Sequence, residues 1–365
     1  MTDVPKPVHT HAHKGRGAVS GRDGRFEVRP VEYEAEEAAA RAARRPETVL
    51  TGMRAASIIT KNDSPDIPFN RSINPYQGCE HGCIYCYARP SHSYLGLSPG
   101  IDFETRIFYK PNAAERLLAE WEKPGYACEP ITLGANTDPY QPAEKTTRVT
   151  RSLLELFVRH RHPVSIITKS HLVLRDADLL ERLAAERLCS VAISIPTLDA
   201  KLKRIMEPRV PAAEMRLGAI EALVARKVPV SVLVAPVIPA INDAELEGIV
   251  ERVAAAGASG AHYIFLRLPH EVRDLFVEWL EEHFPDRAQH VMSLVRQASG
   301  GRDYDSRFGV RQRGRGPYAE LIGQRFRAAC RRHGLGTGGR LRALDESLDC
   351  NRFEAPGRRQ LGLGF

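Results

Sequence analysis

No stretch of the chain is apolar for long enough to span a membrane, and the first residues lack the apolar run of a secretory signal. Both absences exclude the simplest sequence signals for membrane insertion and export. They predict a cytoplasmic protein with no membrane partner. The 365 residues, 43% of them hydrophobic, can bury one barrel-sized core with extensions at both ends.

Cysteines are few, and their distribution argues against a disulfide framework. The chain has seven, an odd number, and three of them stand close together. The other four show no spacing typical of a second metal site, so each is interpreted as a small core residue or a free thiol. These four are Cys128, Cys189, Cys330 and Cys350. Such usage is typical of a reducing compartment.

The three close cysteines, Cys79, Cys83 and Cys86, form a CxxxCxxC pattern that is one ligand short of a closed metal site. A four-iron cluster held by three thiolates leaves one iron open for a further ligand. Gly78 and Gly82 permit the positive φ values that a loop around a cluster requires. The pattern therefore predicts a [4Fe-4S] site. The alternatives are a structural zinc site, which would need a fourth nearby ligand, and three unrelated buried cysteines.

From residue 72 onward, short apolar runs alternate with amphipathic stretches, which is typical of βα units around a parallel sheet. The expected strands are a short one before the cysteines and then 131–135, 164–168, 190–195, 230–235 and 262–266. The expected helices are 112–121, 146–159, 176–186, 211–226 and 243–256. These six strands predict an α/β fold with a partial (β/α)6 barrel of the TIM type. Functional residues of such barrels lie at the carboxyl ends of the strands.

The remaining segments are predicted to extend this core. Residues 1–60 are polar and partly rich in Gly and Arg, so they are expected to form a largely disordered arm. The core would cover residues 61–270, and residues 271–335 would form a helical C-terminal extension with a basic segment. Residues 336–365 are expected to be a flexible tail.

An aromatic residue, Tyr85, stands directly before the last cysteine of the triplet, and the loop as a whole resembles the signature of the radical S-adenosylmethionine superfamily. The resemblance implies that the open iron chelates S-adenosylmethionine. One electron then cleaves this cofactor to methionine and a 5′-deoxyadenosyl radical, which abstracts hydrogen from a substrate, here unknown. An external electron donor such as a flavodoxin or ferredoxin is also implied. The protein itself would bind, orient and shield these groups.

Polar residues follow successive predicted strands at the functional end. Asn136, Thr137 and Asp138 follow the second strand, Lys169 follows the third, and Ser194 lies in the fourth. Each alone is typical of a turn or cap, but their shared position favours one binding site. A carboxylate, an ammonium group and a hydroxyl suit a cationic sulfonium that carries an amino-acid head group.

Further stretches are similar to the spore photoproduct lyase branch of this superfamily, and within it to a bacterial group with no assigned substrate. They include Thr168-Lys169-Ser170-His171, Glu207-Pro208 and Ala235-Pro236. The resemblance covers residues 72–268. It implies that the S-adenosylmethionine site is lined by Tyr85, Asp138, Lys169 and Ser194, to which we add the loop residues Asn136 and Thr137.

Asn136 marks a departure from that branch. Photoproduct lyases carry at this place a cysteine that returns a hydrogen atom to the product radical. An amide cannot donate a hydrogen atom as a thiol does, so the chain is not expected to reverse a thymine photoproduct by the known route.

Positive charge is concentrated near the C-terminus. The formal net charge is +7, and residues 299–333 hold nine Arg against two Asp and one Glu. The first five of these arginines are Arg302, Arg307, Arg311, Arg313 and Arg315. Arginines interleaved with aromatic residues and glycines suit phosphate contacts and base stacking, although a solvated basic face explains them equally well.

Two alternative functions follow from these observations. The Arg-rich segment and the lyase resemblance favour an enzyme that repairs or modifies nucleic acid. A non-catalytic iron–sulfur protein is the other alternative. The polar strand ends argue against it, because a protein that only holds a cluster needs no such pocket.

Overall fold

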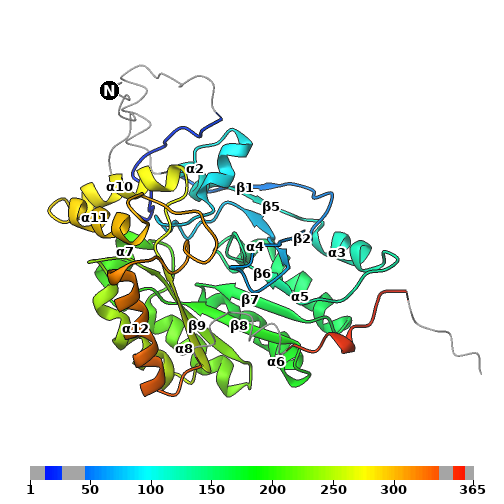
Figure 1. Cartoon of the computed structure of the whole chain (residues 1–365). Helices are drawn as coiled ribbons and strands as arrows, with labels where there is room; N and C mark the ends of the chain where they lie inside the picture. Colours follow the sequence, from blue (N-terminus) through cyan, green and yellow to red (C-terminus); the bar gives the residue numbers. More distant parts are fainter. Residues whose placement is uncertain (1–12, 27–45, 337–347, 358–365) are drawn as a thin grey trace, which may run out of the picture.

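The computed structural model describes residues 13–26, 46–336 and 348–357. Their centre is a seven-stranded sheet flanked by helices (Figure 1). From edge to edge the strands are β10 (Gly260–Phe265), β9 (Val230–Val237), β8 (Cys189–Ser194), β7 (Val164–Thr168), β6 (Ile131–Leu133), β3 (Arg71–Ile73) and β2 (Thr60–Lys61). All neighbours pair in parallel except β2, which runs antiparallel to β3 at one edge.

The parallel strands lie side by side in chain order, which confirms the predicted α/β fold of repeated βα units. Helices connect successive strands and lie against the sheet (Figure 1). They are α3 (Ala113–Trp121), α4 (Glu144–Thr147), α5 (Val149–Arg159), α6 (Ala177–Ala185), α7 (Ala200–Met206), α8 (Ala213–Ala225) and α9 (Leu246–Ala255). Within the described residues β10 and β2 remain the two edges, so the partial barrel is open.

Apolar runs bury the sheet on both faces. β7 has the sequence VSIIT and β8 the sequence CSVAIS, and nearly every residue of both is buried. Such runs are typical of central parallel strands with helices on either side. The main core joins these strands to the helices through side chains such as Phe157 of α5 and Leu183 of α6.

Three longer helices follow the sheet. They are α10 (Glu271–His283), α11 (Ala288–Ala298) and α12 (Pro317–Arg332). The first two form a second core together with α7 and with Ile84 and Tyr85 of the cysteine segment. The third packs on α9 and β10, where Ile322 and Phe326 join the main core. None of the described helices is both long and apolar enough to cross a bilayer.

A small second sheet leads into the cysteine segment. Its order is β1 (Val49–Gly52), β5 (Arg106–Tyr109) and β4 (Tyr76–Gln77). Residues 78–87, which we call the cluster loop, follow β4 directly, and a helical turn η1 (Arg89–Leu95) and α2 (Ile101–Thr105) come next. β4 and β5 pair in antiparallel fashion, so they fix the start of the cluster loop.

Residues 13–26 form what we call the N-terminal strap, and here the structure differs from the predicted disordered arm. Ala18 and Val19 are 0% and 4% exposed. The strap runs beside α10 (Figure 1), where Arg22 pairs with Glu278 at 2.7 Å. Small residues allow this segment to pack closely although its composition is typical of disorder. The other residues predicted for the arm before residue 46, namely 1–12 and 27–45, lie outside the described residues.

The predicted flexible tail also contains a packed piece. Residues 348–357 include the turn η4 (Cys350–Arg352), and the Phe353 ring lies 4.9 Å from that of His162 and 5.6 Å from that of Trp121. Both partners are buried, so this segment covers one end of the main core. The rest of the predicted tail, 337–347 and 358–365, lies outside the described residues.

The close approach of the strap to the cluster loop generates a first prediction. A Cβ at Gly17 would lie 1.8 Å from the carbonyl oxygen of Gly82, so Gly17→Ala cannot be accommodated without moving backbone. Overpacking of this kind costs about 1–3 kcal/mol. We expect Gly17→Ala to lower the midpoint temperature of thermal unfolding and to increase the rate of proteolysis within residues 13–26.

Gly21→Ala is the matched control, because a Cβ at Gly21 meets nothing within 4 Å. It should leave both measurements unchanged. Equal behaviour of the two variants would show that the strap does not pack on the cluster loop.

Candidate active site

A cavity of about 430 Å³ lies at the carboxyl ends of the parallel strands, within the size range of cofactor sites. It brings together all the residues that the sequence predicted for cofactor and metal binding. They are Cys79, Cys83, Tyr85, Cys86, Asn136, Thr137, Asp138, Lys169 and Ser194. These residues come from segments up to 115 positions apart in the sequence, from Cys79 to Ser194, so the fold assembles one site from them.

The cluster loop has the backbone that its glycines permit. Gly78 and Gly82 have φ values of 79° and 67°, and the Cys79 amide donates to the carbonyl oxygen of Phe103 at 2.9 Å. At Gly82 a Cβ would lie 2.7 Å from the Glu104 carboxylate. Glycine is therefore required there both by the left-handed conformation and by the space available.

The three thiols of the loop fit an iron–sulfur cluster by their chemistry. All are free, and Cys79 and Cys83 are each 7% exposed. Burial raises the pKa of Cys83 to about 12, with Glu207 adding to this and Lys169 opposing it. Among the described residues no three Cys, His, Asp or Glu side chains form a group that could hold a single metal ion. Thiolates here need a bound positive charge, and a cluster held by three thiols would supply it.

A buried ion pair fixes one side of the cluster loop. Arg89 Nη2 lies 2.5 Å from Glu104 Oε1, and both side chains are 0% exposed. Arg89 Nε donates to the carbonyl oxygen of Cys83 at 3.0 Å. The Glu104 carboxylate also accepts from the amides of Gly17 and Ala18, at 2.9 and 2.8 Å. One pair thus holds the loop and the N-terminal strap together.

A second buried pair fixes the other side. Glu207 accepts from the Tyr85 hydroxyl, and its other oxygen lies 3.0 Å from Arg216 Nη2. Arg216 Nη1 in turn donates to the carbonyl oxygen of Ser194 at 2.7 Å. With its hydroxyl engaged, Tyr85 lines the cavity with its ring, whose centroid lies 5.9 Å from Lys169 Nζ.

Asp138 joins the ends of β6 and β7. Its carboxylate accepts from Thr168 Oγ1 and the Lys169 amide, both at 2.7 Å, and from the Tyr140 amide at 2.8 Å. His81 Nδ1 lies 3.3 Å from the same group. Burial alone would raise the pKa of Asp138, but His81 and the hydrogen bonds outweigh it and keep this pKa below its usual value. Both carboxylate oxygens are occupied by hydrogen bonds within the protein, and one of these bonds fixes the position of the Lys169 backbone.

Lys169 differs from Asp138 because no described residue accepts a hydrogen bond from its ammonium group. Burial would lower the pKa of Lys169, yet the negative groups around it, Cys83 and Glu207 first, raise it above its usual value. The hydroxyl of Ser194 donates to the carbonyl oxygen of Ala235 at 3.2 Å, so the lone pairs of its oxygen can accept a hydrogen bond from a ligand. The cavity therefore presents a cation and an acceptor to a ligand.

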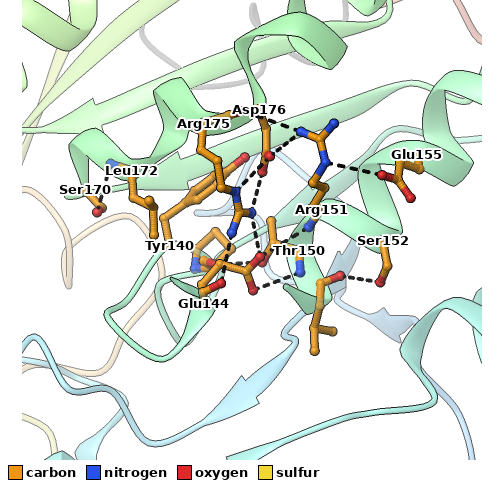
Figure 2. A network of polar contacts seen from close by, with 12 residues as sticks. Tyr140, Glu144, Thr150, Arg151, Ser152, Glu155, Ser170, Leu172, Arg175 and Asp176 are labelled. Carbon is orange, nitrogen blue, oxygen red and sulfur yellow. Dashed lines mark hydrogen bonds and ion pairs between the residues drawn. The ribbon is translucent and has the colours of Figure 1, made fainter. Parts of the chain in front are cut away.

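The loop after β6 is fixed by a buried polar network, shown in Figure 2. Glu144 is fully buried and accepts from Arg175 Nη2 at 2.7 Å and from the Thr150 amide at 3.0 Å. Arg175 and Arg151 both pair with buried Asp176, at 2.7 and 2.9 Å. This network anchors the segment that carries three of the predicted site residues.

Tyr87 and Arg267 line the cavity although neither was among the predicted site residues. Tyr87 donates through its hydroxyl to the carbonyl oxygen of Ala135, and the Arg267 guanidinium lies 5.1 Å from the centroid of its ring. Both line the cavity, together with Lys61. Tyr87 directly follows Cys86, and Arg267 follows the sixth parallel strand, so position at a strand end was the available signal.

Arg311 of the Arg-rich segment is occupied rather than open to phosphate. Arg311 Nε lies 2.6 Å from Asp66 Oδ2, and the Gly309 amide donates to the other oxygen of Asp66 at 2.6 Å. The neighbouring Gln312 accepts from the Phe265 amide at 2.7 Å, and both Arg311 and Gln312 line the cavity. The segment thus closes part of the cavity wall.

Comparisons with known proteins agree with this geometry. Residues 73–253 match the model of the "Radical SAM superfamily". An uncharacterised protein of Mycobacterium tuberculosis is 36% identical over 233 residues, which cover 63% of this chain and 68% of the relative. An uncharacterised protein of Methanocaldococcus jannaschii is 28% identical over 214 residues, 59% of this chain and 76% of that one.

Among solved structures, spore photoproduct lyase complexed with dinucleoside spore photoproduct is similar with a TM-score of 0.55. The two share 18% sequence identity, and the match covers 85% of this chain and 86% of the lyase, so it establishes a common fold. Given the matching family model, the relative at 36% identity and the site described above, the chain belongs to the radical S-adenosylmethionine superfamily, whose members are enzymes that use a [4Fe-4S] cluster and S-adenosylmethionine.

Proposed function

We propose that the cavity binds a [4Fe-4S] cluster through Cys79, Cys83 and Cys86, with S-adenosylmethionine beside it. Together these groups supply a 5′-deoxyadenosyl radical that abstracts hydrogen from a substrate. The observation that supports this is the convergence on one cavity of three free thiols, two of them buried, and the Lys169 ammonium group, which donates no hydrogen bond to any described residue. No side chain can perform this chemistry itself, so the chain binds, orients and excludes water.

The proposed roles follow from the contacts of each side chain. Lys169 would bind the cofactor carboxylate, because it lines the cavity and its ammonium group has no hydrogen-bond partner among the described residues. Ser194 would accept from the amino group. Tyr85 would contribute its ring, and Asp138 would act as a positioning residue for Lys169 because its oxygens are engaged. Asn136 and Thr137 would form the adjoining wall.

Nucleic acid is the second candidate for the substrate. One observation favours it: the Arg-rich segment reaches the cavity wall, while Arg302, Arg313 and Arg315 of the same segment are exposed. The structurally similar lyase was solved with a dinucleoside. Arg311 is removed from the set of phosphate contacts because it pairs with Asp66. Since Asn136 stands where the lyases have a cysteine, any such reaction would differ from photoproduct reversal.

We also propose a reducing, cytoplasmic location, supported by the free state of all seven cysteines, each of which lies in a described segment. The proposed core is 61–270, extended by the helices of 271–335.

The cluster generates the second prediction. Anaerobically purified protein should contain about four irons per chain, and dithionite-reduced protein should convert S-adenosylmethionine to 5′-deoxyadenosine. Replacement of Cys79, Cys83 and Cys86 by Ala should abolish both iron binding and turnover, because the thiolates are the iron ligands. Iron analysis and chromatography provide the readouts.

Cys189→Ala is the control, because that buried thiol lies in β8 and does not line the cavity. It should retain iron. Zinc in place of iron, or iron that persists in the triple variant, would refute the cluster assignment. Iron binding without any cleavage of S-adenosylmethionine would instead favour a non-catalytic iron–sulfur protein.

The third prediction concerns the cofactor pocket. Lys169→Met removes the charge but keeps most of the side-chain volume, so the dissociation constant for S-adenosylmethionine should rise at least about tenfold, as expected for a lost charge-assisted hydrogen bond. Iron content should stay constant. Lys145→Met, on the exposed side of α4, is the matched control. Equal affinity of both variants and the parent would remove Lys169 from the pocket.

The fourth prediction tests the nucleic-acid candidate. The parent protein should bind single-stranded DNA with an affinity that falls steeply as salt increases. The variant Arg302→Ala/Arg313→Ala/Arg315→Ala should bind more weakly and flatten the log-log salt slope by about 2–3 units. Arg331→Ala/Arg332→Ala on α12 serves as control. Binding that is insensitive to salt, or untouched by the triple variant, would leave these arginines as a solvated face.

A further inference from the structure

The cavity is built from two groups of strands. The proposed cofactor residues Asp138, Lys169 and Ser194 end or follow the central strands β6, β7 and β8. Two further cationic residues come from the edges of the sheet: Lys61 lies in β2, and Arg267 follows β10. β2 and β10 are opposite edges of the described sheet, yet both contribute to one cavity. The sheet therefore curves around the cavity and brings its edges toward one another.

A short segment closes the gap between these edges. The Phe265 amide of β10 donates to the carbonyl oxygen of Gln312 at 2.7 Å. On the other side, Arg311 Nε lies 2.6 Å from Oδ2 of Asp66, in the loop after β2. The segment is thus bonded to both edges. The cavity wall at this junction, which we call the seam, consists of Lys61, Arg267, Arg311 and Gln312.

Arg267 differs from the other arginines around the cavity. Arg89, Arg216 and Arg311 each form an ion pair with a carboxylate. Arg267 forms none with any described residue: its Nε is buried without a hydrogen-bond partner, and its Nη2 donates to the Tyr304 hydroxyl at 3.3 Å. A guanidinium that has lost water without gaining an anionic partner is costly. Its place on a cavity wall indicates that a ligand supplies the partner.

The guanidinium of Arg267 is held in a way that leaves its donors available. It lies over the Tyr87 ring, 5.1 Å from the ring centroid, and the Tyr87 hydroxyl is itself bonded to the carbonyl oxygen of Ala135. A cation–π contact uses the face of the ring and occupies none of the five N–H donors of a guanidinium. Such a fork suits a carboxylate or a phosphate, because either group can accept two parallel hydrogen bonds.

The cavity wall has more cationic than carboxylate side chains. Asp138 is the one carboxylate among the described residues that line it, and its oxygens are occupied by hydrogen bonds. Lys61, Lys169 and Arg267 form no ion pair with the described residues. Since Lys169 is assigned to the cofactor carboxylate and the thiols to the cluster, Lys61 and Arg267 are two cations without a counter-ion. A ligand of negative charge would complete the site.

Resting on the proposed function, we propose that the seam binds an oxyanion group of the substrate, a carboxylate or a phosphate carried by a small organic molecule. Arg267 donates a pair of hydrogen bonds to this group, and Lys61 adds a second positive charge. Ile67, Phe69 and Ile264, which also line the cavity, contact the carbon part of the molecule. The cavity of about 430 Å³ must hold the cofactor as well, so it leaves little space for a larger substrate.

The test titrates oxyanions into the reconstituted holoenzyme with S-adenosylmethionine bound, by calorimetry at constant ionic strength. Inorganic phosphate and succinate are the probes, and chloride is the blank. The two probes distinguish a phosphate ester from a carboxylic acid as the source of the group. Arg267→Met removes the guanidinium, and Lys61→Met removes the second cation. Arg182→Met, on the exposed side of α6 and outside the cavity wall, is the matched control.

We expect the parent to bind at least one of the two probes, and Arg267→Met to bind it at least about tenfold more weakly because the bidentate contact is lost. Lys61→Met should weaken binding less, because this side chain is exposed. Arg182→Met should match the parent. All three variants should keep the iron content and the S-adenosylmethionine affinity of the parent. Arg267→Gln replaces the Met variant if circular dichroism shows that the latter does not fold.

A parent that binds neither probe, or binding that Arg267→Met leaves unchanged, would overturn the proposal. Loss of S-adenosylmethionine affinity in Arg267→Met would overturn it by assigning Arg267 to the cofactor. Weaker binding of single-stranded DNA by Arg267→Met, with neither probe bound by the parent, would overturn it in favour of a nucleic-acid contact. Absence of 5′-deoxyadenosine from the dithionite-reduced parent would count against the proposed function instead, while titrations without S-adenosylmethionine would still decide whether the seam binds an oxyanion.

Discussion

The ion pair between Arg89 and Glu104 is the contact on which the rest of the site depends. Both side chains are fully buried, so neither charge can be hydrated and each requires the other. The same two side chains bind the carbonyl oxygen of Cys83 and the amides of Gly17 and Ala18. Removal of one partner from such a pair typically costs about 3–5 kcal/mol, because the remaining charge stays buried. Loss of either side chain would therefore destabilise both the cluster loop and the strap.

The opposite side of the loop repeats this arrangement with different residues. Glu207 links the Tyr85 hydroxyl to Arg216, which in turn holds the end of β8. The cluster loop is thus held on two sides by buried arginine–glutamate pairs. Asp138 links the carboxyl ends of β6 and β7 through its hydrogen bonds to Thr168 and Lys169. A site for radical chemistry benefits from this rigidity, since positioning and exclusion of water are what the protein contributes.

Short-range patterns in the sequence were sufficient to predict the strands and the residues that line the cavity. The strand 164–168 was placed at its observed bounds because an apolar run between two helical stretches is a signal within a few residues. The nine predicted site residues reach one cavity because strand ends converge in this fold class. The sequence could not reveal that Glu104 accepts a hydrogen bond from the Gly17 amide. The two residues lie 87 positions apart, and a contact over such a separation produces no periodic pattern in the sequence. The ion pair between Arg311 and Asp66, which lie 245 positions apart, was not predicted for the same reason. The packing of the strap was not predicted because its polar composition is typical of disorder.

The central claim is that S-adenosylmethionine binds within the cavity at an iron that the cysteines leave open. Electron paramagnetic resonance of the dithionite-reduced protein, recorded before and after addition of S-adenosylmethionine, tests it most directly. The account predicts a signal of a reduced [4Fe-4S] cluster whose g values change when S-adenosylmethionine is added. A cluster signal that is identical with and without saturating S-adenosylmethionine would contradict it.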